Sequence, residues 1–106
     1  MSTLSNDAFI REKLNNFVAW LTSLLSKHMD NARHKEFAEK LDTLRTLDTA
    51  HWIVHVTESM CPYRANVPAY VTKMLSENGL EPSALTPAEL DKFGRYVSMW
   101  IDVVSQ

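Results

Sequence analysis

Two histidines and a glutamate have the spacing of a metal site. His51, His55 and Glu58 stand at positions i, i+4 and i+7, so in a helix all three project from one side. Two neutral imidazoles and a carboxylate suit zinc or iron. The opposite side of that helix is apolar, however, and the glutamate does not stand between the histidines, as it does in a zinc-protease helix. We interpret the three residues as the solvated face of an amphipathic helix and expect neither a metal nor a cofactor. A small metal-dependent enzyme or sensor that uses these three residues is an alternative function.

The single cysteine is the second candidate for chemistry. Cys61 cannot form an internal disulfide, which fits a reducing, cytoplasmic environment. Pro62 follows it, so the thiol is predicted to lie at the C-terminal end of a helix, where the dipole disfavours a thiolate. No phosphate-binding loop and no nucleophile beside a base is evident in the sequence. These observations lean away from an enzyme.

Basic residues gather between positions 33 and 45. They are Arg33, His34, Lys35, Lys40 and Arg45. Acidic residues alternate with them around the same predicted helix, which is typical of a solvated, salt-bridged face, and the net charge of −2 gives no overall attraction for phosphates. A nucleic-acid-binding regulator that uses this helix is therefore an alternative function, less favoured than protein binding.

The chain carries more apolar side chains than one small core requires. Tyr96, Met99 and Val103 form a second apolar strip beside the core stripe of the last predicted helix. Phe9 and Trp20 likewise point away from the core stripe of the first. Aromatic residues and methionine are enriched in interface cores, so Trp20, Tyr96, Met99 and Val103 are predicted to contact another protein chain, either a second copy or a foreign partner. The alternative is that these helices lie centrally within the monomer.

Two helices are predicted in the first half of the chain. Ser5, Asn6 and Asp7 are competent N-caps for a helix that runs to about His28, preceded by a flexible segment over residues 1–6. A second helix follows Asp30, and its apolar stripe is narrow, so most of it is expected to face water.

The second half is predicted to hold three more helices. Residues 49–60 combine β-branched residues with an apolar pattern of helical period, and we predict a helix because no second strand is evident. Pro68 starts the next helix, and Asn78-Gly79 stops it. The sequence Thr86-Pro87-Ala88-Glu89 then provides an N-cap, a proline at the first helical position and the glutamate of a capping box.

The sequence therefore predicts an all-α protein. Its 106 residues suffice for one domain, a compact bundle of about five helices, and 45% hydrophobic and 23% charged residues are near the averages for soluble proteins. No segment reads as a signal peptide or a membrane span. The predicted core comprises Leu14, Phe17, Leu21, Leu41, Trp52, Val56, Val71, Leu75, Leu90, Phe93, Val97 and Trp100. The predicted function is a non-catalytic protein–protein interaction module, acting as a homodimer or as a small subunit or adaptor of a larger assembly.

Overall fold

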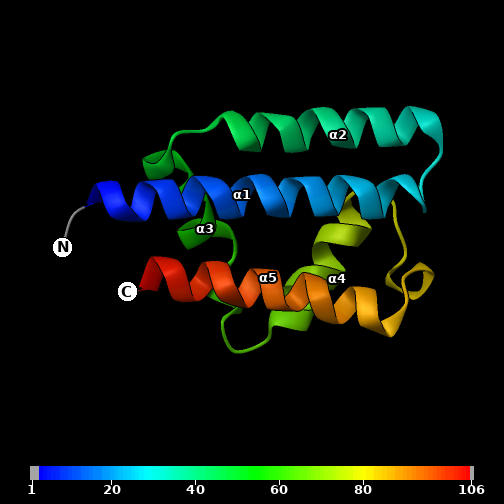
Figure 1. Cartoon of the computed structure of the whole chain (residues 1–106). Helices are drawn as coiled ribbons and strands as arrows, with labels where there is room; N and C mark the ends of the chain where they lie inside the picture. The colour runs from blue at the N-terminus through cyan, green and yellow to red at the C-terminus, as the bar shows by residue number, and fades with distance from the viewer. Residues whose placement is uncertain (1–2, 106) are drawn as a thin grey trace. The chain divides into compact units, whose positions relative to one another are not determined.

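The computed structural model describes residues 3–105, with the side chains of residues 7–30 and 32–105, and this part of the chain is all-α, which confirms the predicted fold class (Figure 1). Its helices are α1 (Thr3–Ser26), α2 (Asn31–Thr46), α3 (Thr49–Ser59), α4 (Val67–Glu77) and α5 (Pro87–Ser105), with short 3-10 helices at Cys61–Tyr63 and Pro82–Ala84. The chain divides into two compact units, with the boundary inside α3, between Trp52 and Ile53. The single domain inferred from the chain length stays a prediction.

In the first unit, α1 and α2 run side by side in opposite directions (Figure 1). The apolar stripes of both helices are buried over most of their length, and their buried residues are Ile10, Leu14, Phe17, Val18, Leu21, Leu24 and Leu25 of α1 with Phe37 and Leu41 of α2. Leu44, which continues the predicted stripe of α2, is half-buried. The first helix was predicted to run to about His28, but α1 ends at Ser26 and His28 lies half-buried in the turn that follows. The Asp30 carboxylate begins α2 by accepting the Arg33 N–H at 2.9 Å.

The start of α1 differs from the prediction. Because α1 begins at Thr3, residues 3–6 belong to the helix, and the three predicted N-caps lie inside it. Residues 1–2 of the predicted flexible segment lie outside the described residues. Asp7 has a tertiary partner in place of a capping role, since its carboxylate accepts a hydrogen bond from the Thr49 hydroxyl at the start of α3. Local sequence alone could not indicate that partner, 42 residues away.

The predicted helix over residues 49–60 is α3, which the structure bounds at Thr49–Ser59. It is helical although β-branched residues occupy its centre. Asp48 begins this helix by accepting the His51 backbone N–H at 2.8 Å. Trp52, Val56 and Met60 are buried along one side. Burial of that stripe outweighs the small intrinsic preference of the β-branched residues for strands.

In the second unit, α4 packs against α5. Asn66 caps α4 by accepting the Ala69 N–H at 3.3 Å, and Gly79 adopts a φ of 78° after its end, the left-handed stop predicted from the sequence. The buried residues of this unit are Val56, Met60, Tyr70, Val71, Leu75, Leu80, Leu85, Phe93, Val97, Trp100 and Ile101. Leu90 was predicted to be buried with them, but it is half-buried because it lines a groove described below.

The capping box of α5 is confirmed at both of its hydrogen bonds. The Thr86 hydroxyl accepts the Glu89 N–H at 3.1 Å, and the Glu89 carboxylate accepts the Thr86 N–H at 2.8 Å. Both bonds satisfy N–H groups that the helix itself cannot pair.

We therefore expect Thr86→Ala to lower the free energy of unfolding by about 1 kcal/mol, because it removes the oxygen that accepts the Glu89 N–H. Thr86→Ser keeps that oxygen and should be nearly silent. Urea unfolding followed by circular dichroism measures both, and equal midpoints for the two variants would contradict this role of Thr86.

Among the described residues, no helix is both long enough and apolar enough to span a membrane.

Candidate protein-interaction groove

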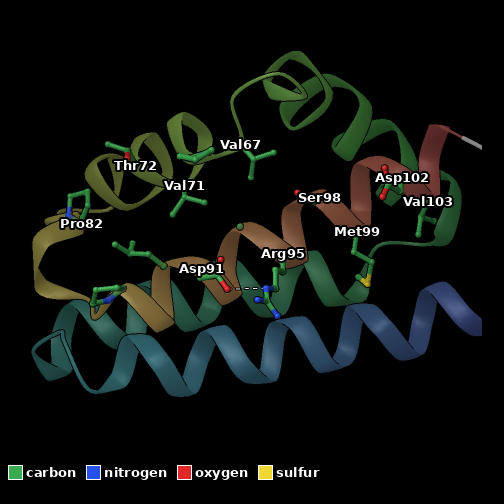
Figure 2. A pocket seen from close by; sticks show the side chains of 14 residues that line it. Val67, Val71, Thr72, Pro82, Asp91, Arg95, Ser98, Met99, Asp102 and Val103 are labelled. Atoms are coloured by element: carbon green, nitrogen blue, oxygen red, sulfur yellow. Dashed lines mark ion pairs between the residues drawn. The ribbon is translucent and has the colours of Figure 1, made fainter.

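An apolar depression of the second unit runs between α4 and α5 (Figure 2). This α4–α5 groove has a volume of about 940 Å³. Figure 2 shows Val67 and Val71 directed from α4 toward α5. Its lining comprises Val67, Pro68, Val71, Thr72, Pro82, Pro87, Leu90, Asp91, Gly94, Arg95, Ser98, Met99, Asp102 and Val103. The groove therefore has mainly apolar walls, and its charged side chains all lie on α5.

Three residues that lie one turn apart form the middle of the α5 side of the groove. Leu90, Gly94 and Ser98 follow one another at i, i+4 and i+8, so each lies about one turn beyond the last on the same side of the helix. A Cβ atom placed on Gly94 would lie 3.7 Å from Cγ1 of Val67, which is ordinary van der Waals contact. The lining extends along α5 from Pro87 to Val103, and at 1.5 Å per residue this is about 24 Å. The groove is long enough for a helix of about four turns.

Three charged side chains border the groove, all from α5. The Arg95 Nε atom lies 2.8 Å from the Asp91 carboxylate, and both side chains are exposed (Figure 2). Asp102 forms no ion pair with any described residue. Arg64 is directed to the same end of α5, but it donates a hydrogen bond to the Ser105 hydroxyl. Near the C-terminal end of α5, the groove thus has one carboxylate with no ionic partner in the described part of the chain.

The predicted interface residues of α5 are divided between two depressions. Met99 and Val103 line the α4–α5 groove, whereas Tyr96 and Met99 line a smaller neighbouring hollow of about 430 Å³. All three side chains are half-buried. Trp20, the fourth predicted residue, is half-buried in the first unit. Whether these four residues contact another chain stays a prediction.

The polar residues of the groove were not predicted from the sequence. By helical period, Asp91, Arg95, Ser98 and Asp102 form a solvated face separate from the apolar strip, but in the structure they line the same groove as Met99. The signal that could have indicated the groove is Gly94. A glycine inside a helix costs about 0.5–1 kcal/mol relative to alanine, and its usual compensation is a close approach of another group.

The metal candidates do not form a site in the described part of the chain. No group of three or more histidine, cysteine or acidic side chains is arranged there to hold a metal ion. His51 is exposed, and its Nδ1 atom lies 2.7 Å from the Asp48 carboxylate. Hydrogen bonds from the backbone and the side chain of His51 lower the pKa of Asp48. The His51 ring thus assists the cap of α3.

His55 occupies a different environment on the same helix. Burial lowers the pKa of its imidazole from the usual 6.5, and the Glu58 carboxylate offsets part of that shift. The folded protein therefore takes up this proton at a lower pH than the unfolded chain does. The stability that depends on neutral His55 is fully present above about pH 6.5 and is lost as the pH falls through the folded pKa.

We expect the urea midpoint of the wild type to fall between about pH 7.5 and pH 5, and to fall less steeply in His55→Gln, which cannot take up the proton. Parallel urea titrations of both proteins at several pH values measure the difference in slope. The same slope in both would contradict a contribution from His55.

The basic residues of α2 do not form a uniformly positive face. A groove of about 1050 Å³ between α1 and α2 is lined by Lys35 and Arg45, and equally by Glu39 and Asp42. The Arg45 Nε donates to the Asp42 carboxylate at 3.0 Å. Phosphate binding depends on cations whose charge is not compensated in this way.

Comparisons of this chain with protein families, with curated proteins and with solved structures found no match. The residues of the α4–α5 groove and their chemistry therefore carry the functional inference.

Proposed function

We propose that this protein is a non-catalytic protein–protein interaction module that binds another chain through the α4–α5 groove. The observation that carries the proposal is the groove itself, a mainly apolar depression between α4 and α5 that is about 24 Å long. Helix-binding domains use grooves of this kind, in which an amphipathic helix buries its apolar side. The protein acts as a homo-oligomer or as a small subunit or adaptor of a larger assembly.

The chemistry of the lining supports binding rather than catalysis. Met99 and Val103 supply apolar surface that a partner can cover, and polar side chains stand at the border, as in other protein interfaces. The charged lining residues are Asp91, Arg95 and Asp102, among which Asp91 and Arg95 are already paired. A pair of this kind offers orientation and specificity to a partner. No observed geometry favours the metal-dependent or nucleic-acid-binding alternatives.

A charge placed in the groove is expected to abolish binding. Met99→Glu or Val103→Glu would leave an unpaired carboxylate in a desolvated interface, while the half-buried position lets the helix itself persist. We expect both variants to lose association and to keep the helical circular dichroism of the wild type. Ala32→Glu is the matched control, because it adds the same charge at an exposed position in the first turn of α2, outside the groove.

Light scattering over a range of concentrations measures self-association. Affinity capture with wild type, Met99→Glu and Ala32→Glu as baits tests for binding of a foreign partner. That partner must be retained by wild type and by Ala32→Glu, and it must be lost with Met99→Glu. A monomeric wild type that retains no such partner would overturn the proposal. Unfolding of both groove variants would assign Met99 and Val103 to the core instead.

A further inference from the structure

The α4–α5 groove needs a convex apolar ridge as its occupant. We infer that this ridge is α1 of a second copy of this chain, an inference that rests on the proposed function. A stripe of four residues along α1, at i, i+4, i+7 and i+11, comprises Phe9, Lys13, Asn16 and Trp20, here called the α1 stripe. At 100° per residue it lies roughly a quarter turn or more from the buried stripe of α1.

The α1 stripe is at least partly accessible along its length and combines two aromatic side chains with two polar ones. Phe9 is 44% exposed, and it is one of two large apolar side chains in the described residues that are exposed to this degree. Lys13 extends over it, with Nζ 5.5 Å from the ring centroid. Asn16 is exposed and Trp20 is half-buried. Large aromatic side chains are the usual anchors of protein interfaces, so this stripe has the chemistry of a docking ridge.

Charge fixes how the α1 stripe fits the groove. Lys13 is its cation, and Asp102 is the lining carboxylate without an ionic partner among the described residues. When Lys13 lies beside Asp102, each of the two groups gains a partner of opposite charge. Asp91, the other carboxylate of the lining, is already paired with Arg95. The Lys13–Asp102 pair therefore sets the register.

The spacing of the other residues agrees with this register. Trp20 lies about 10.5 Å along α1 from Lys13, and Gly94 lies about 12 Å along α5 from Asp102. When α1 runs antiparallel to α5, Trp20 thus lies at the level of Gly94, where Val67 of α4 forms the opposite wall. Phe9 lies about 6 Å along α1 on the other side of Lys13, beyond Val103, the last lining residue of α5. The two aromatic side chains of the stripe therefore flank the Lys13–Asp102 pair.

Mixing two defective variants tests the inference directly. Phe9→Glu places a charge in the α1 stripe and leaves the groove unchanged. Met99→Glu places a charge in the groove and leaves the α1 stripe unchanged. We expect each variant alone to be a folded monomer under conditions where wild type associates. An equimolar mixture should associate again, because the stripe of one variant meets the groove of the other. A mixture of Met99→Glu and Val103→Glu is the control, and it should stay monomeric.

A charge exchange tests the register. Lys13→Glu or Asp102→Lys alone should weaken self-association at least about ten-fold, because like charges then meet in the interface. The double variant Lys13→Glu/Asp102→Lys should recover to within about three-fold of wild type. Sedimentation equilibrium of the full chain measures each dissociation constant, with circular dichroism to verify folding.

The outcomes separate this inference from the proposed function. Association of Phe9→Glu equal to wild type, together with loss in Met99→Glu, would overturn the α1 stripe as occupant and leave the groove as an interface. A failure of the mixed variants to associate would overturn it in the same way. A monomeric wild type would also overturn it, and the proposed function would then depend on a foreign partner captured by wild type and lost in Met99→Glu.

Discussion

Phe93→Ala is expected to lower the free energy of unfolding by about 3 to 5 kcal/mol. The Phe93 ring is fully buried, with 0% of its surface exposed, so truncation removes its apolar contacts and leaves a cavity that close-packed neighbours fill only in part. Leu21→Ala, at an equally buried position of α1, should cost about 2 to 5 kcal/mol for the same reason.

Urea unfolding followed by circular dichroism measures these changes. Leu90→Ala is the matched control, because Leu90 lies one turn before Phe93 on α5 but is half-buried, and its truncation should cost clearly less than that of Phe93. Unchanged midpoints for Phe93→Ala and Leu21→Ala would show that the buried stripes carry little of the stability. If the chain is a single domain, as predicted, it unfolds in one cooperative transition, and both substitutions should shift the midpoint of that transition.

Arg11→Ala is expected to cost about 2 kcal/mol, because hydrogen bonds from a charged donor are each worth about 1.5–3 kcal/mol and two are removed at a partly solvated site. The Arg11 guanidinium donates to the Leu47 carbonyl and, at 2.8 Å, to the Arg45 carbonyl. The last carbonyls of a helix lack partners within it, and Arg11 of α1 supplies partners for the Arg45 and Leu47 carbonyls at the end of α2.

Arg11→Lys is the informative comparison. Lysine retains the charge but has no planar fork, so one ammonium group cannot reproduce both bonds, and we expect only part of the stability to return. The free energy of unfolding from urea titrations again gives the measurement. Full recovery in Arg11→Lys would mean that charge alone matters at this position, and an unchanged Arg11→Ala would mean that solvent satisfies the two carbonyls equally well.

The sequence by itself determined the features that depend on near neighbours. The caps at Asp30 and Thr86 and the stop at Gly79 each involve groups within a few residues, and each lies where the sequence predicted it. The buried stripes were predictable for a similar reason, because a period of 3.6 residues places apolar side chains on one side of a helix whatever that side meets. Phe17 and Val97 illustrate this in the two units.

Tertiary structure alone decided what each helix side meets. Leu90 has the sequence position of a core residue, yet it is half-buried because it lines the groove between α4 and α5. Asp7 is a competent cap in sequence, yet its partner is Thr49. Arg11 reads as a surface charge, yet it caps α2. These roles depend on pairs of groups more than 30 residues apart or on the space between two helices, and helical periodicity holds no information about either.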